Sequence, residues 1–235
     1  MAIDYKYSAA DRLCDLIDDN FKLLMVMSRF GISLGFGEKT VKEVCDTEGV
    51  DCDTFLAVAN FISSEHTSFS VEELPQLRIS ALMQYLKNAH TYFLDFVLPM
   101  LRRKLIEAID CSREDHVAFL ILKFFDGFVN EVREHMEYED EHVFTYVEAL
   151  IGGRRNAEFC ITEFASHHSK VDERLSELKG IITKYYVETS DNLLLSAVLF
   201  DIYSCEQDLA SHNQVEDCLF VPAVMQVEKE LSHEK

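Results

Sequence analysis

The sequence predicts an all-α protein, an up-down four-helix bundle with a small helical domain in front of it. Three observations support this fold class. Only three prolines and eight glycines, the residues that most often interrupt helices, occur in 235 residues. Hydrophobic residues make up 48% of the chain and charged residues 27%, as in ordinary folded proteins. The second part of the chain contains four long stretches in which apolar residues recur at steps of three and four, the pattern of helices that share a bundle core.

The first part, residues 1–70, is predicted to form the small N-terminal domain. Its helical patterns are short, and turns that contain glycine separate them. These patterns cover residues 12–27, 41–48 and 53–62. Residues 63–75 are predicted to be a linker, and the bundle is assigned to residues 71–235.

Capping residues and helix breakers predict where the four bundle helices begin and end. In chain order, the markers are Pro99 at an end or kink of the first helix, Ser112 and Asp115 in a capping box at the start of the second, Gly152-Gly153 at its end, Gly180 at an end or kink of the third, and Ser190 and Asp191 at the start of the fourth.

Charge and hydropathy exclude several classes of partner. The net charge of −20 argues against nucleic acid and against an anionic membrane surface, because both require clustered Lys and Arg. No uninterrupted apolar run has the length of a transmembrane helix. Residues 1–11 are polar and acidic, unlike a secretory signal, so we expect a cytoplasmic protein. The seven cysteines form no CxxC pair and are expected to be reduced core residues.

Six polar side chains interrupt the apolar seams of the four bundle helices. Burying a glutamate costs several kcal/mol unless a cation compensates its charge, so a shared metal explains these interruptions. The predicted ligands are His90, His135, Glu139, His168, His212 and Glu216.

The spacing of these residues repeats between the two halves of the bundle. His90 precedes His135 by 45 residues, and His168 precedes His212 by 44. Each second histidine begins an HxxxE pair, which places an imidazole and a carboxylate on one helix face, one turn apart. His168 is chosen over the adjacent His167 because only His168 lies in the apolar register. The alternative is that these residues are core histidines and members of surface ion pairs. Six residues in register across four helices favour the metal.

Imidazole and carboxylate ligands without thiolate suit iron, manganese or zinc. Four histidines can serve two metals at two each, and the two glutamates can bridge them. Positions then remain for an oxo or hydroxo bridge and for O2 or NO. A ferritin-like site would need ExxH on two helices, and Glu139-x-x-His142 supplies it once. His142 itself is left open as an extra ligand, a hydrogen-bond donor to a ligand, or a core histidine.

The bundle motifs resemble the hemerythrin-like (HHE) family, most closely its Repair of Iron Centres branch. The resemblance covers most of the chain and implies a di-iron site of four histidines and two bridging glutamates. It rests on His135-Met-Glu-Tyr-Glu139 followed by Val143-Phe144, on His212-Asn-Gln-Val-Glu216 followed by Phe220-Val-Pro222, on His90 followed by Tyr92 and Leu98-Pro99, and on the position of His168.

The N-terminal part is similar to the small helical domain that precedes the bundle in this branch. The similar segments are Phe30-Gly31-Ile32-Ser33, Lys39 to Cys45, and Gly49-Val50-Asp51. One departure is that Gly35-Phe36 stands where the family has two adjacent cysteines implicated in nitrosative chemistry. Activity that requires a thiol at that place is therefore in question, and Cys45 and Cys52 are not obvious substitutes.

The resemblance implies a di-iron protein that protects or repairs iron–sulfur centres under nitrosative or oxidative stress, by iron donation or by NO or O2 chemistry. Damaged iron–sulfur proteins would then be its partners. The alternative is a non-catalytic sensor or carrier that binds O2 or NO. A third and less favoured interpretation is an enzyme that consumes peroxide or O2. The sequence does not decide whether the protein is an enzyme. A homodimer is compatible with the sequence, but no residue establishes it.

Overall fold

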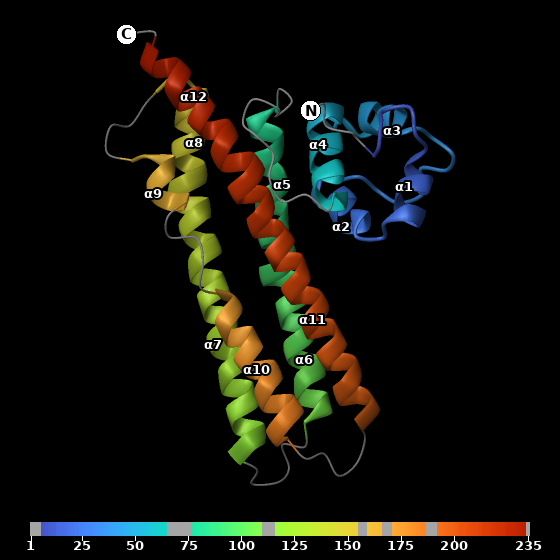
Figure 1. The fold of residues 1–235 in the computed structure, drawn as a ribbon, viewed down its shortest axis with the longest axis vertical. Coiled ribbons are helices and arrows are strands. Elements are labelled where there is room, and N and C mark those ends of the chain that lie inside the picture. Colours follow the sequence, from blue (N-terminus) through green and yellow to red (C-terminus); the bar gives the residue numbers. More distant parts are fainter. Residues whose placement is uncertain are drawn as a thin grey trace. The chain divides into compact units, whose positions relative to one another are not determined.

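The computed structural model of the chain describes residues 6–64, 77–109, 116–154, 159–165, 171–186 and 192–233. Within these ranges every regular element is helical, and the sole β-type contact is an isolated bridge between Arg12 and Thr40 (Figure 1). The predicted all-α fold class is therefore confirmed. None of the described helices combines the length and the apolar character that crossing a membrane requires.

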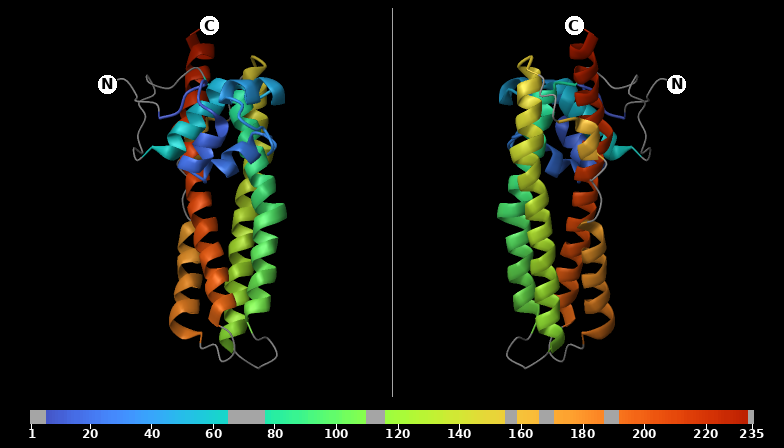
Figure 2. Two further views of the ribbon diagram at one scale, coloured as in Figure 1. Left: turned by 90° about the vertical axis from the view of Figure 1, so that its right-hand side faces the viewer. Right: turned by 90° about the vertical axis from the view of Figure 1, so that its left-hand side faces the viewer.

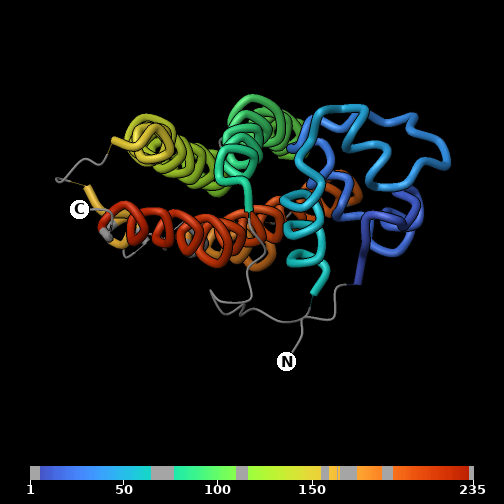
Figure 3. The backbone as a smooth tube through the Cα atoms, turned by 90° about the horizontal axis from the view of Figure 1, so that it is seen from above, coloured from blue at the N-terminus to red at the C-terminus, as the bar shows by residue number. Residues whose placement is uncertain are grey.

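Four short helices form the N-terminal part, drawn blue to cyan in Figure 3. They are α1 (Leu13–Asp19), α2 (Leu23–Arg29), α3 (Val41–Glu48) and α4 (Cys52–Ser63). The limits of α3 match the prediction, because Thr40 and Glu43 form a capping box at its start and Gly49, at φ 72°, ends it.

The single helical segment predicted over residues 12–27 is wrong, because Asn20 divides it into α1 and α2. Asn20 has an extended backbone, at φ −145° and ψ 96°. Its side chain accepts a hydrogen bond from the backbone N–H of Lys22 at 3.1 Å and donates one to Ser63 Oγ at 2.8 Å. Asparagine competes in this way with helical hydrogen bonds, which hydrophobic periodicity does not reveal.

The described residues divide into two compact units. The first contains residues 1–89, 143–166 and 211–235, and the second contains residues 90–142 and 167–210. The predicted boundary near residue 70 lies outside the described residues, and the division into 1–70 and 71–235 stays a prediction.

In the first unit, one hydrophobic core joins the N-terminal helices to α5 (Ile79–Thr91), α8 (Phe144–Ile151) and α12 (Val221–His233). The ring of Phe30 lies 4.9 Å from that of Tyr85, centroid to centroid. One turn further along α5, the Asn88 side chain donates a hydrogen bond to the Arg29 carbonyl at 2.7 Å. These contacts hold α5 against the N-terminal helices.

The second unit contains four helices that run side by side (Figures 1 and 2). They are α6 (Leu98–Ala108), α7 (His116–Tyr138), α10 (Val171–Tyr185) and α11 (Asn192–Val215) up to residue 210. Chain direction alternates from each helix to the next, as in an up-down bundle.

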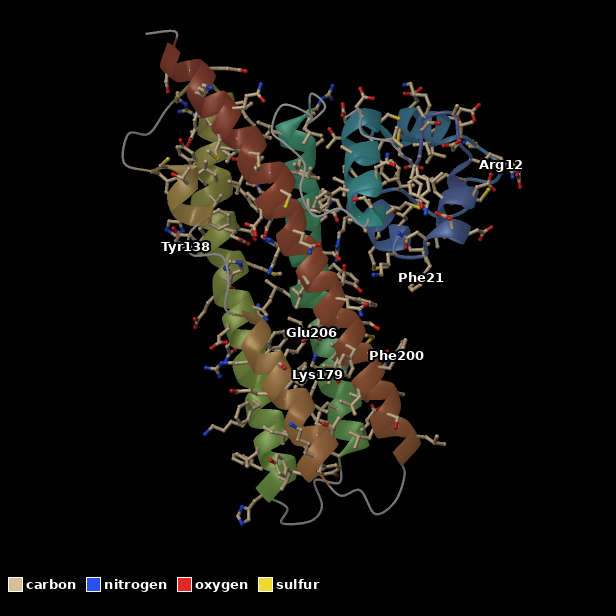
Figure 4. All side chains as sticks on the ribbon, viewed as in Figure 1. Arg12, Phe21, Tyr138, Lys179, Phe200 and Glu206 are labelled. Carbon is tan, nitrogen blue, oxygen red and sulfur yellow. The ribbon has the colours of Figure 1, made fainter. Side chains whose placement is uncertain are left out.

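Buried apolar side chains and ion pairs between helices hold this second unit together. Lys104 of α6 pairs with Asp201 of α11 at 2.7 Å. Lys179 of α10 pairs with Glu206 of α11 (Figure 4). The Lys179 ammonium lies 4.2 Å from the centre of the Tyr203 ring. The Lys179 side chain is 11% exposed, so this pair lies largely inside the bundle.

The predicted markers of the bundle helices have different outcomes. Gly152 and Gly153 follow the last residue of α8, as expected, and Gly153 adopts φ 74°. Pro99 lies in the first turn of α6, directly after a π-helical segment. Gly180 marks no helix end, because α10 continues through it to Tyr185. The markers at Ser112, Asp115, Ser190 and Asp191 lie outside the described residues.

The predicted third helix is represented by α9 (Ile161–Ala165) and α10, with residues 166–170 outside the description. The buried carboxylate of Glu228 in α12 holds the start of α9, because it accepts hydrogen bonds from the Tyr146 hydroxyl at 2.5 Å and from the Ile161 backbone N–H at 3.2 Å.

Candidate metal centre

Four of the six predicted ligands come together in the structure. They offer two imidazole nitrogens and two carboxylate oxygens that all lie within 4.8 Å of one another. Each side chain is buried, with a relative exposure of 0% or 1%. The four residues are His90, Glu139, His212 and Glu216. Among the His, Cys, Asp and Glu side chains in the described part of the chain, these four form the group whose geometry could hold a metal ion.

The two HxxxE motifs position their carboxylates as the helical spacing predicts. Residues four apart stack on one face of a helix, so the histidine and glutamate meet one turn apart. His212 Nε2 lies 3.1 Å from Glu216 Oε1, and His135 Nε2 lies 3.1 Å from Glu139 Oε1.

Glu139 contacts a different histidine with each of its oxygens. Oε1 faces His135 Nε2 at 3.1 Å, while Oε2 faces His90 Nε2 at 3.2 Å. The carboxylate is fully buried. A carboxylate between two imidazoles, one on each oxygen, has the arrangement needed to bridge two cations.

A π-helical segment begins at each of the two glutamates. These are η3 (Glu139–Val143), between α7 and α8, and η4 (Glu216–Phe220), between α11 and α12. A third, η2 (Tyr92–Val97), follows α5 directly after His90 and Thr91. Such segments insert an extra residue into a helix and occur often at functional sites, because they redirect side chains.

This insertion explains why His142 does not lie in the core seam. Uninterrupted α-helical periodicity would continue the buried row from Glu139 to His142, but Val143 and Phe144 are buried instead. His142 is exposed, and its ring stacks on Tyr138 with centroids 4.6 Å apart. Of the three roles left open for His142, that of a core histidine is therefore wrong, and the structure places it outside the four-residue group.

The outcome differs for the other two predicted ligands, His135 and His168. His135 contacts the group through Glu139, but it is not one of the four mutually close residues, and its side chain is 27% exposed. His168 and the neighbouring His167 lie outside the described residues. The six-residue ligand set therefore stays a prediction.

The donor set fits a metal cation. Two carboxylates at 0% and 1% exposure carry two negative charges into a region without bulk water, where effective penalties reach several kcal/mol per ion. Neutral imidazoles supply lone pairs but no positive charge, so divalent cations would neutralise the group. Nitrogen and oxygen donors without thiolate suit iron, manganese or zinc.

Sequence reasoning missed one residue beside this group. The side chain of Asp140 lies 3.0 Å from His90, between Asp140 Oδ1 and His90 Nδ1. The available signal was weak, since an acidic residue next to a glutamate on a helix is usually a solvated surface residue. The three π-helical segments had no signal in the hydrophobic pattern.

A family model described as the hemerythrin HHE cation-binding domain matches residues 81–224, which is more than half of the chain. The chain belongs to the hemerythrin family. The match begins in α5 and ends in α12, so it includes both HxxxE motifs and His90. No curated protein matches the chain. The closer resemblance to the Repair of Iron Centres branch is not resolved by the family match, which is to the hemerythrin domain in general.

Proposed function

We propose that this hemerythrin-family protein holds two iron ions and acts in the cytoplasm to protect or repair iron–sulfur centres under nitrosative or oxidative stress. The observation that carries the proposal is the buried group of two histidines and two glutamates with ligand atoms within 4.8 Å of one another. The proposed ligands are His90, His135, Glu139, His168, His212 and Glu216.

The contacts of Glu139 support two metals rather than one. Its two oxygens face His90 and His135 at 3.2 and 3.1 Å, so one carboxylate can serve two ions that each receive an imidazole. The second motif supplies the equivalent pair, His212 and Glu216. If held by these residues, two ferrous ions would supply the capacity to bind small diatomic molecules such as O2 and NO and to donate electrons to them.

The chain's own residues prepare the site for this chemistry. The glutamates hold negative charge at a fixed place, and the histidines would bind the metals as neutral ligands. Near-complete burial of His90, Glu139, His212 and Glu216 excludes bulk water from their ligand atoms. Damaged iron–sulfur proteins would receive iron or be protected from NO.

A second candidate, a sensor or carrier that binds O2 or NO without turnover, is favoured by the backbone at Gly35. This residue adopts φ 96°, a conformation in which a residue with a side chain is strained. The turn is thus built for glycine at the position where the Repair of Iron Centres branch has the first of two cysteines. Gas binding by the metals alone would need no thiol there.

Metal analysis and spectroscopy test the proposal. Protein purified without oxygen and supplied with Fe²⁺ should hold about two irons per chain, and its absorption spectrum should change on exposure to NO or air. His212→Ala should lose iron, whereas His142→Ala, a matched control at an exposed histidine, should keep it. Iron transfer to an apo iron–sulfur protein would favour repair, and reversible gas binding without transfer would favour the sensor. Iron retention by His212→Ala would contradict the ligand assignment.

A further inference from the structure

Asp140 makes a contact that the ligand set does not include. It follows Glu139 at the start of η3, and its Oδ1 lies 3.0 Å from His90 Nδ1. The His90 side chain is 2% exposed, whereas that of Asp140 is 42% exposed. A carboxylate at the protein surface thus reaches the far side of a buried imidazole ring.

The two ring nitrogens of His90 therefore face two carboxylates. Nδ1 faces Asp140 at 3.0 Å and Nε2 faces Glu139 at 3.2 Å. Consecutive residues of a helix point in different directions, so Glu139 and Asp140 can contact different edges of one ring. These two contacts restrain rotation of the imidazole about its Cβ–Cγ bond.

The contact with Asp140 also favours one of the two neutral tautomers of His90. A carboxylate can only accept a hydrogen bond, so the interaction with Asp140 requires the hydrogen on His90 Nδ1. In the neutral ring, Nε2 then keeps its lone pair and directs it towards Glu139 and the buried group. The hydrogen bond at one nitrogen fixes the ligating role of the other.

We propose that Asp140 is a positioning residue of the metal centre, which accepts the Nδ1–H of His90 and so presents Nε2 as the metal ligand. This inference rests on the proposed function, because it assigns a role towards the same metals. Carboxylates that hold ligating histidines in this way raise the basicity of the imidazole and fix its orientation. Their removal weakens metal affinity by about 10–100-fold.

The order of residues is the same in the second motif, where Asp217 follows Glu216 as Asp140 follows Glu139. The histidine that corresponds to His90 in that half is His168, which lies outside the described residues. The first half alone therefore carries the proposal.

Zinc affinity tests the inference with a probe that needs neither oxygen nor turnover. The variants are Asp140→Ala and Asp140→Asn, and the matched control is Asp126→Asn, which changes a carboxylate of similar exposure paired with Arg102 in the same unit. Competition with a chromophoric chelator should show Zn²⁺ binding about 10–100-fold weaker in Asp140→Ala, less affected in Asp140→Asn, and unchanged in Asp126→Asn.

A second measurement uses the metal-free protein, so that a general loss of structure is recognised. Nitrogen-15 NMR of the histidine rings, with His90 assigned from a His90→Gln variant, should show hydrogen on Nδ1 in the wild type and a mixture of tautomers in Asp140→Ala. Wild-type zinc affinity and an unchanged His90 tautomer in Asp140→Ala would overturn the inference. Failure of the wild type itself to bind Zn²⁺ or Fe²⁺ would instead overturn the proposed function.

Discussion

Replacing Glu139 with glutamine should make the metal-free protein more stable while abolishing its response to metal. Glutamine keeps the shape of glutamate but removes a negative charge from a side chain that is 0% exposed. Most substitutions of buried polar residues destabilise a protein, so an increase in stability is a specific expectation. It follows from the argument that the charge of Glu139 is tolerated because a cation compensates it.

The magnitude follows from burial and from the contacts of the carboxylate. A buried charge costs several kcal/mol, and the contacts with His90 and His135 offset part of this cost. We expect Glu139→Gln to raise the free energy of unfolding of the metal-free protein by about 1–2 kcal/mol. For a chain of this length, each kcal/mol moves Tm by about 2–4 °C, so Tm should rise by about 2–8 °C.

With metal bound, the order of stability should reverse, so that the wild type is more stable than Glu139→Gln. At a free metal concentration 100 times Kd, binding stabilises the wild type by about 2.7 kcal/mol. This corresponds to a rise in Tm of about 5–11 °C, most of which Glu139→Gln should lose.

Thermal unfolding by circular dichroism, with and without Zn²⁺, measures both effects. It should be done near pH 8, above the range in which an ordinary imidazole gains a proton, so that a charged histidine does not stand in for the metal. Glu137→Gln is the control, because Glu137 lies two residues earlier, in α7, with a side chain 57% exposed. A lower metal-free Tm in Glu139→Gln, or a full metal-induced shift in that variant, would refute the reasoning.

Two further predictions concern the N-terminal helices. Asn60→Ala should lower the free energy of unfolding by about 2–3 kcal/mol. The buried Asn60 side chain accepts a hydrogen bond from the Tyr7 N–H at 2.8 Å and donates one to the Tyr7 C=O at 3.0 Å, and both backbone groups would lose this partner. A loss below about 0.5 kcal/mol in urea unfolding would contradict the prediction. Burial raises the pKa of the Cys45 thiol to about 12. The unfolded thiol ionises first, so this contribution to stability is complete below the ordinary thiol pKa of about 8.5 and is lost as the pH rises towards 12. Between about pH 8 and 10, Cys45→Ala should therefore lose less stability than the wild type. If urea unfolding shows that the free energy of unfolding falls equally with pH in both proteins, the prediction is wrong.

The sequence contained enough information for the fold class and for the central residues of the candidate site. Local chemistry specifies α3, because Thr40, Glu43 and Gly49 satisfy its ends. The burial of Glu139 and Glu216 was also predictable, since each lies in an apolar seam one turn after a histidine. These features depend on residues close together in sequence, where side-chain spacing and capping determine the result.

Features that depend on irregular backbone were not predictable. The π-helical segments shift the register of the helices after the glutamates, which moves His142 to the surface and brings Val143 into the core. The break at Asn20 depends on a hydrogen bond to Ser63, 43 residues away. Asp140 resembles a surface acid until the position of His90 is known. In the last two cases, the deciding contact joins residues that lie far apart in the sequence.

The measurement that tests the central claim most directly is the iron content of the wild-type chain purified and loaded without oxygen, combined with its absorption spectrum before and after NO. A di-iron centre with room for NO should give about two irons per chain and a spectrum that changes when NO is added. No bound iron, or a single zinc ion with a featureless spectrum that NO leaves unchanged, would contradict it.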